Sequence, residues 1–396
     1  MAGTETSMRT AVQQAVQAHV SEAAELSLYL LNHPEVSGEE YASSKKIVEL
    51  LQARQFQVTY PFAGYPTAFH ALLDNGEGPE VAFLVEYDAL AGLGHGCGHN
   101  LHGALSVLAG LGMMDLRQKF KGKLHVIGTP AEEENGAKIG MADQGVFDRM
   151  SMAIMMHSWY GGKARADMDA LSLRHYFVTF TGKSAHAVAA PWEGHSALAA
   201  ARKFLDLVDA RRECFTPDIH VNAVFTEGGK QPNILPDKAE LRLEFRTSSL
   251  KSLQRTDEMV RKCAEGAALA LDCKAEFQLA FEFADMVRNA VLETEAERMF
   301  RAYGIAVAPV DEASGSSDVG NVSYHCPAVQ PLIPIMKEMC ALHTPEFRDA
   351  TALPEAEKAM EKGACILAEM ALRVFNDAAF REEIKAAQEK SLAAKL

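Results

Sequence analysis

A thiol and an imidazole near residue 100 could bind a metal ion together. Cys97-Gly98-His99 places the two groups two residues apart, beside glycines that let the backbone turn. Thiolate sulfur and imidazole nitrogen are donors that zinc and related divalent ions accept. A Cys-x-His pair by itself is more often incidental than a ligand pair, so its meaning depends on the donors that the fold brings near it.

Further donors occur at the ends of apolar runs. Glu132 and Glu133 follow one such run, His157 follows the next, and His343 lies much later in the chain. Adjacent acids usually face solvent, and a histidine after a strand is usually a structural group. Donors at the ends of successive apolar runs are hard to explain as independent accidents, so together they indicate a metal site.

The elements that must position these donors alternate between strand and helix. Continuous apolar runs, which are typical of strands buried on both faces, predict strands at 81–85, 124–128 and 153–156, with helices at about 99–114 and 136–145. That alternation predicts an α/β sheet, which binds its ligands at the carboxyl ends of its strands. We therefore expect Asp88, Glu132, Glu133 and His157 to meet at one edge of the sheet.

Helices are expected at both ends of the chain. Apolar residues at helical spacing predict one helix from about Met8 to Leu31, and Ser37-Gly38-Glu39-Glu40 has the form of a capping box before another. The Ala/Lys/Glu-rich end from Asp377 onward is typical of an exposed terminal helix.

The order of elements changes between about Met168 and Glu282. The predicted elements are a strand at 173–181, a helix at 196–211, strands at 220–225 and 239–245, a helix at 250–271 and a strand at 274–279. This β-α-β-β-α-β order is the ferredoxin-like arrangement, which is complete in itself. We therefore predict an inserted domain at 168–282 within a discontinuous catalytic domain at 1–167 and 283–396.

Composition excludes several classes of function. The chain has 396 residues, with 39 Lys and Arg against 53 Asp and Glu, and the resulting net charge of −14 repels phosphate backbones and anionic lipids. We therefore expect no nucleic-acid partner. Apolar runs are too short to cross a bilayer, so no membrane span is expected.

Sequence features also bear on the compartment. The seven cysteines are an odd number scattered along the chain, which indicates a reducing environment rather than a disulfide framework. The first ten residues lack a cationic segment followed by an apolar stretch, so a cytoplasmic protein is expected. The final Ala394-Lys395-Leu396 resembles a peroxisomal address, but three residues match by chance too often to outweigh that expectation.

Motifs along nearly the whole chain resemble one known family. They are Glu86-Tyr87-Asp88-Ala89-Leu90, His95-Gly96-Cys97-Gly98-His99-Asn100, Gly128-Thr129-Pro130-Ala131-Glu132-Glu133, Met156-His157-Ser158, Gly182-Lys183-Ser184-Ala185-His186-Ala187, Pro232-Asn233-Ile234-Leu235-Pro236 and Gly315-Ser316-Ser317-Asp318. In this order they resemble the dinuclear-metal aminoacylase and carboxypeptidase G family. The Cys-x-His form is similar to its amidohydrolase branch, which includes auxin-conjugate hydrolases, p-aminobenzoyl-glutamate hydrolase and certain dipeptidases.

The resemblance implies a role for each matching residue of the metal motifs. The positions that match ligands of two divalent ions are Cys97, His99, Glu133, His157 and His343. Glu132 matches the general base that takes a proton from the attacking water, and Asp88 matches the carboxylate that orients a ligand histidine. Zinc or manganese is expected, and cobalt or nickel could also be active.

The inserted domain also matches the resemblance, which implies that it dimerises and covers the site. His186 matches a histidine that stabilises the substrate oxyanion, typically in the site of the neighbouring subunit. Asn233 and Arg246 match positions that bind the polar backbone or carboxylate of the substrate. The implied assembly is a homodimer formed through residues 168–282.

Some positions depart from the family pattern or stay open. Glu86 stands where other branches place a histidine, which leaves that metal sphere less defined. His102 follows on the same predicted helix and could support the site or lie on the helix surface. Glu134 is a third acid in its row and is expected to be exposed.

The predicted function is a metal-dependent hydrolase that cleaves the amide bond of a small N-acyl amino acid, aminobenzoyl amino acid or dipeptide. One alternative is a metal-dependent C–N hydrolase that deaminates an aromatic or other small amine, because the same chemistry attacks any suitably held electrophilic carbon. The other is a catalytically silent binding protein of the same fold. Retention of Glu132 with every expected ligand argues against a silent protein, which has no need of the base.

Overall fold

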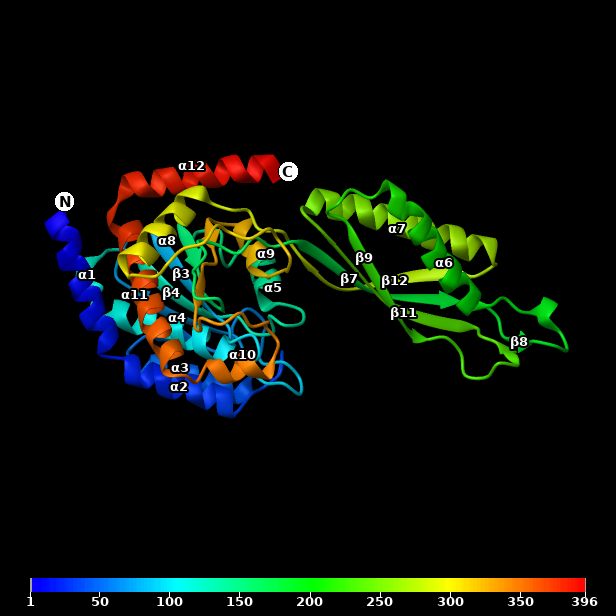
Figure 1. Cartoon of the computed structure of the whole chain (residues 1–396), viewed down its shortest axis with the longest axis horizontal. Coiled ribbons are helices and arrows are strands. Elements are labelled where there is room, and N and C mark those ends of the chain that lie inside the picture. Colours follow the sequence, from blue (N-terminus) through cyan, green and yellow to red (C-terminus); the bar gives the residue numbers. More distant parts are fainter. Residues whose placement is uncertain (1, 396) are drawn as a thin grey trace. The chain divides into compact units, whose positions relative to one another are not determined.

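The structure is a computed structural model that describes residues 2–395, and it divides into two compact units (Figure 1). The first contains the chain up to Asp169, together with Met286–Glu312 and Asp318–Ala394. The second contains Ala170–Asp285 and the short segment Ala313–Ser317. Each unit has its own cluster of buried hydrophobic side chains.

The first unit is built on a mixed sheet of six strands in the order β1-β2-β4-β3-β5-β13. Its strands are β1 (Gln57–Thr59), β2 (Phe69–Asp74), β3 (Glu80–Val85), β4 (Lys123–Gly128), β5 (Met152–Ile154) and β13 (Ala328–Val329). β3 is parallel to β4 and β5, β13 is parallel to β5, and β2 is antiparallel to β4. β6 (His157–Trp159) and β14 (Leu332–Pro334) form a separate parallel pair. The predicted α/β class with a mixed central sheet is confirmed.

Helices surround this sheet. They are α1 (Ala2–Gln17), α2 (Val20–Asn32), α3 (Tyr41–Ala53), α4 (His99–Asp115), α5 (Ala137–Asp143), α8 (Ala290–Ala302), α9 (Val319–Ser323), α10 (Pro345–Ala350), α11 (Pro354–Asn376) and α12 (Ala378–Lys395). α4 packs on β3 and contacts α1, α2 and α11, so it is buried from His99 to Met113 (Figure 1). A helix covered on all sides fixes the position of its first residues, which carry the predicted donors.

Several local predictions are wrong. The single helix expected at 8–31 is two helices with a break at Ala18-His19. The expected capping box does not form, because Ser37 Oγ bonds Asp88 and the N-cap of α3 is Glu40, whose side chain makes no capping bond. The terminal helix is not fully exposed, since α12 buries Phe380 and Ile384.

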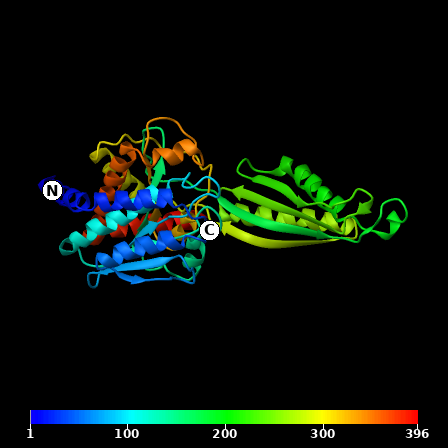
Figure 2. The same cartoon turned by 90° about the horizontal axis from the view of Figure 1, so that it is seen from below.

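The second unit is an antiparallel sheet in the order β12-β7-β11-β9, with two helices on one face (Figure 2). Its elements are β7 (Ser172–Thr181), α6 (Ala197–Arg211), β9 (His220–Glu227), β11 (Lys238–Thr247), α7 (Leu250–Ala270) and β12 (Lys274–Phe283). The ferredoxin-like order is confirmed. A short antiparallel pair of β8 (Ala185–His186) and β10 (Ile234–Leu235) is an addition that the sequence pattern did not predict.

Gly103 fixes how closely α4 approaches β3, because a Cβ at this position would lie 2.1 Å from the backbone oxygen of Glu86. We expect Gly103→Ala to lower the free energy of unfolding by about 1–3 kcal/mol, the usual effect of overpacking. Thermal unfolding checks this, with Gly266→Ala as the control. Gly266 is an exposed residue of α7 with its nearest neighbour at 3.9 Å, so its substitution should leave Tm unchanged or raise it. Equal Tm changes in the two variants would contradict the packing argument.

Candidate metal centre

The donor residues reach one region of the first unit from four chain segments. Cys97 and His99 lie at the N-terminus of α4, where Gly98 adopts φ 86°. A Cβ on Gly98 would lie 2.9 Å from the Ser158 side chain, so the turn requires glycine here. Glu132 and Glu133 lie in the loop after β4, and His157 begins β6. His343 precedes α10, and its backbone N–H donates to the Gly96 carbonyl at 2.9 Å.

One group of donors consists of Cys97, Glu133 and His343, whose ligand atoms all lie within 4.8 Å of one another. His343 Nε2 is 3.4 Å from Glu133 Oε2. The His343 side chain is 52% exposed while the Glu133 side chain is 9% exposed. This group therefore has one open side, which a catalytic metal site needs for water or substrate.

His99 links this group to two others. Its Nε2 atom is 3.8 Å from a carboxylate oxygen of Glu132 and 3.8 Å from one of Glu133. His99 also belongs to a fully buried group with Glu86, His102 and His157. His157 Nε2 in turn lies 3.3 Å from Cys97 Sγ. The structure thus brings all five predicted ligands, together with Glu132, into overlapping groups.

The chemistry of these donors fits a bound cation. His99 Nε2 and Glu133 Oε1 are buried without a hydrogen-bond partner, and leaving such atoms unsatisfied is costly. Burial and the Glu133 carboxylate raise the pKa of the Cys97 thiol well above its usual range, so its thiolate needs a nearby cation. Burial lowers the pKa of His157 to about 3, which keeps this ring neutral, the form that binds a metal.

Asp88 holds His99 in place. Its carboxylate accepts from His99 Nδ1 at 2.9 Å, from Ser37 Oγ at 2.8 Å and from the Glu133 N–H at 3.0 Å. Burial works against the charged carboxylate, but His99 and these hydrogen bonds keep the pKa of Asp88 below its usual value. The Nε2 atom of His99 therefore points to the donor groups with Nδ1 fixed behind it.

Glu132 has an environment unlike that of Asp88. Burial first, and then the carboxylates of Glu86, Asp318 and Glu133, raise its pKa well above the usual value. Its one ion pair among the described residues is the 3.8 Å approach to His99. Glu134, as expected, is exposed. A carboxyl group with a raised pKa and no hydrogen-bond partner among the described residues is suited to accept a proton and to release it again.

Four residues of this region were not assigned from the sequence, namely Glu86, His102, Lys138 and Asp318. His102 is buried rather than on the helix surface, with Nε2 3.1 Å from Glu86 Oε2 and Nδ1 3.2 Å from the Ser158 N–H. Two sequence features could have identified His102 and Glu86. His102 follows His99 by one helical turn, and Glu86 precedes Asp88 by two residues. No pattern indicated Lys138.

The remaining predicted residues belong to the second unit. His186 ends β8 and Asn233 immediately precedes the paired strand β10, and both residues are exposed. The Ala187 N–H donates to the Asn233 carbonyl at 2.9 Å, so the two residues are neighbours. Arg246 lies on β11, where its Nε donates to Glu244 Oε1 at 2.8 Å. The structure therefore groups His186 with Asn233 and pairs Arg246 with a carboxylate on its own strand. The roles of all three stay predictions.

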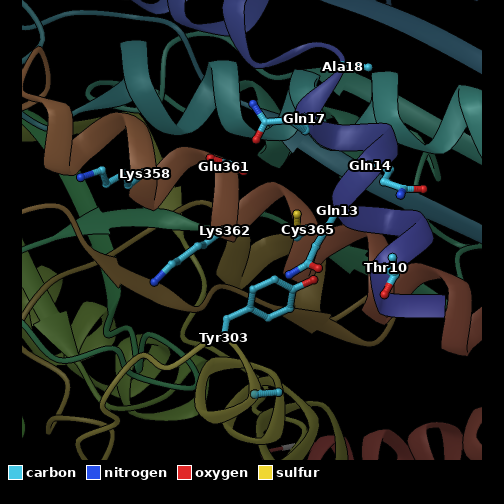
Figure 3. Close-up of a pocket in the computed structure, with 11 residues that line it drawn as sticks. Thr10, Gln13, Gln14, Gln17, Ala18, Tyr303, Lys358, Glu361, Lys362 and Cys365 are labelled. Atoms are coloured by element: carbon cyan, nitrogen blue, oxygen red, sulfur yellow. The ribbon is translucent and has the colours of Figure 1, made fainter. Parts of the chain in front are cut away.

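A pocket of about 720 Å³ lies on another part of the first unit, between α1, the end of α8 and α11 (Figure 3). Its lining includes Gln13, Gln17, Tyr303, Lys362 and Cys365. It contains none of the donors described above, so the pocket and the candidate metal centre are separate. Among residues 2–395, no helix is both long enough and apolar enough to cross a membrane.

Comparisons with known proteins bear on both units. A family model described as a peptidase dimerisation domain matches residues 172–271. The Xaa-Arg dipeptidase of Mus musculus is 31% identical over 388 residues, covering 92% of this chain and 89% of that protein. One of the p-aminobenzoyl-glutamate hydrolase subunits of Escherichia coli is 28% identical over 318 residues, covering 74% of this chain and 65% of that protein.

A solved structure extends the likeness to the fold. It is that of a Bacillus subtilis protein described as a dinuclear metal binding peptidase from the M20 family. It has a TM-score of 0.70 at 21% identity and covers 91% of this chain and 99% of its own. At this identity the match bears on the fold alone.

Cys97→Ser should weaken metal binding, because a hydroxyl remains protonated at neutral pH and is a poorer ligand than a thiolate. We expect at least a tenfold loss of affinity for the more weakly held ion, measured as metal content after dialysis against graded chelator. Cys214→Ser is the matched control, since Cys214 is exposed and far along the chain in the second unit. Equal metal content in both variants and the wild type would remove Cys97 from the ligand set.

Proposed function

The chain belongs to the M20 peptidase family, and on this premise we propose that it hydrolyses the amide bond of a small N-acyl amino acid, aminobenzoyl amino acid or dipeptide. The observation that carries the proposal is the position of Glu132. Its carboxylate has no fixed partner and lies at the border of the donor groups, 3.8 Å from His99 Nε2. This is the place from which a general base can reach a water held by those donors.

Two divalent ions are proposed as cofactors, held by Cys97, His99, Glu133, His157 and His343. When bound, such ions lower the pKa of water and polarise the scissile carbonyl. Zinc or manganese suits a set of thiolate, imidazole and carboxylate donors, and cobalt or nickel is also compatible. Asp88 keeps His99 in the orientation that presents Nε2 to the ion.

Glu132 is proposed to move the proton of the reaction. Its carboxylate accepts a proton from the attacking water and then delivers that proton to the leaving amine. The raised pKa of Glu132 favours both steps, because the protonated form is stable enough to be a donor and the charged form is basic enough to be an acceptor. Glu133 accepts no proton in this scheme and serves as a ligand.

The second unit is proposed to form a homodimer and to supply substrate-binding groups. The match of residues 172–271 to a dimerisation domain supports the dimer. His186, an exposed neighbour of Asn233 at the β8–β10 pair, is proposed to stabilise the oxyanion in the site of the neighbouring subunit. Asn233 and Arg246 are proposed to bind the polar backbone or carboxylate of the substrate. All seven cysteines are unpaired, which supports a cytoplasmic location.

Glu132→Gln should retain both metal ions and lose turnover by about 10²–10⁴-fold, because the amide keeps the shape of the side chain but accepts no proton. Metal analysis and a panel of N-acyl amino acids, aminobenzoyl amino acids and dipeptides test this. Glu134→Gln is the control, since Glu134 is the exposed neighbour and should behave as the wild type. Full turnover in metal-loaded Glu132→Gln, or release of ammonia without an amino acid, would contradict the proposal.

Mixing two inactive variants tests whether His186 acts in the neighbouring subunit. A heterodimer of His186→Ala and Glu132→Gln contains one site with an intact base and an intact partner histidine. Random exchange in a twofold dimer should therefore restore about a quarter of the wild-type activity. If His186 acts within its own subunit, every site carries a lesion and the mixture stays inactive. Mass spectrometry first demonstrates that the subunits have exchanged. If activity does not recover in that exchanged mixture, the assignment of His186 to the neighbouring subunit is wrong.

A further inference from the structure

Lys138 on α5 is a lysine with no exposed surface. Its Nζ donates to Glu86 Oε1 and to Asp318 Oδ1, each at 2.6 Å. Its backbone N–H also donates to Asp318 Oδ2 at 3.3 Å. Even with contacts this close, a buried group of charges is often no more stabilising than apolar side chains of the same volume, so this triad calls for a reason beyond stability.

The triad adjoins the proposed base. Carboxylate oxygens of Glu86, Glu132 and Asp318 all lie within 4.8 Å of one another. Three carboxylates this close repel one another, and a single ammonium bonds only two of them. Glu132 is the member that Lys138 leaves unpaired among the described contacts.

Glu86 extends the triad toward the ligands. Its second oxygen, Oε2, lies 3.1 Å from His102 Nε2 and 3.6 Å from His99 Nε2. Because Lys138 fixes Oε1, the carboxylate is held with Oε2 toward the histidines. Lys138 thereby orders the carboxylates around the site without contacting a proposed ligand.

We propose that Lys138 is a positioning residue that selects Glu132 as the carboxylate free to move a proton, by binding Glu86 and Asp318 as fixed anions. The inference rests on the proposed function, because it assigns a task to the base of that reaction. In this arrangement Asp318 binds the Lys138 ammonium and thereby keeps it away from Glu132. Without the Asp318 charge, Lys138 bonds the nearby Glu132 instead and immobilises the base.

The first test uses turnover of metal-loaded variants. Asp318→Asn should lower kcat at least tenfold with KM and metal content nearly unchanged, because the ammonium then pairs with Glu132. Adding Lys138→Met to Asp318→Asn should raise kcat at least fivefold above that of Asp318→Asn alone, since no ammonium remains to hold the base. Asp206→Asn is the matched control. It removes the carboxylate of an exposed Lys203–Asp206 pair at 2.8 Å and should leave kcat unchanged.

The second test needs neither substrate nor the Lys138 variant, so it stands even if the double variant fails to fold. Tm is measured for the wild type, Glu132→Gln, Asp318→Asn and the combination of these two substitutions, all with bound metal. Glu132→Gln should lower Tm more in the Asp318→Asn background than in the wild type, by about 3 °C or more. The reason is that Glu132 becomes the partner of Lys138 only when Asp318 is neutral.

The outcomes separate this inference from the proposed function. If the wild type cleaves none of the amide panel, the proposed function fails while the Tm comparison still decides the role of Lys138. The proposal that Lys138 selects Glu132 is wrong if Asp318→Asn keeps kcat within twofold of an active wild type. It is also wrong if the variant that combines Lys138→Met with Asp318→Asn is no faster than Asp318→Asn alone. An equal Tm effect of Glu132→Gln in both backgrounds would overturn it as well.

Discussion

The rest of the site depends on the hydrogen bonds that the buried Asp88 carboxylate accepts. They come from the loop before α3, from the loop after β4 and from the first residue of α4. Three segments that carry or support donors are thereby fixed relative to the end of β3. Because Glu133 is attached through its backbone, its side chain stays available to a cation. A carboxylate without these partners could not fix the two loops and the start of α4 relative to one another.

The site also shows how opposite environments shift the pKa values of similar carboxyl groups in opposite directions. Asp88 is surrounded by donors and stays charged, while Glu132 is surrounded by carboxylates and holds its proton more tightly. Lys138 adds a third environment, in which burial opposes its charge but Asp318 and Glu86 raise its pKa. Glu86, which it contacts, has a pKa well below the usual value, because Lys138 and the neighbouring histidines outweigh burial. The identity of a residue alone does not set its role here.

The sequence predicted the fold and the donor groups because both depend on local patterns. Apolar runs ending in polar residues gave the strands β3 and β4, and the order of elements gave the ferredoxin-like unit. The place of Lys138 could not be predicted, because its partners lie 52 and 180 residues away and a lysine in a helix is usually solvated. The break between α1 and α2 and the use of Ser37 by Asp88 were missed for a similar reason. Ser37 bonds Asp88 across the fold, and at the break the His19 ring lies 2.9 Å from Asp115, 96 residues further along the chain.

The first and last strands of the second unit begin and end close together, since Leu173 of β7 is paired with Phe283 of β12. For the first unit, the whole of Ala170–Asp285 therefore behaves, once folded, as a short loop. The entropic cost of closing a loop grows with the logarithm of its length. A loop of a few residues therefore costs about 3 kcal/mol less free energy to close than a flexible chain as long as Ala170–Asp285. The insertion thus adds a separate core while leaving the host sheet nearly as easy to close as an uninterrupted one.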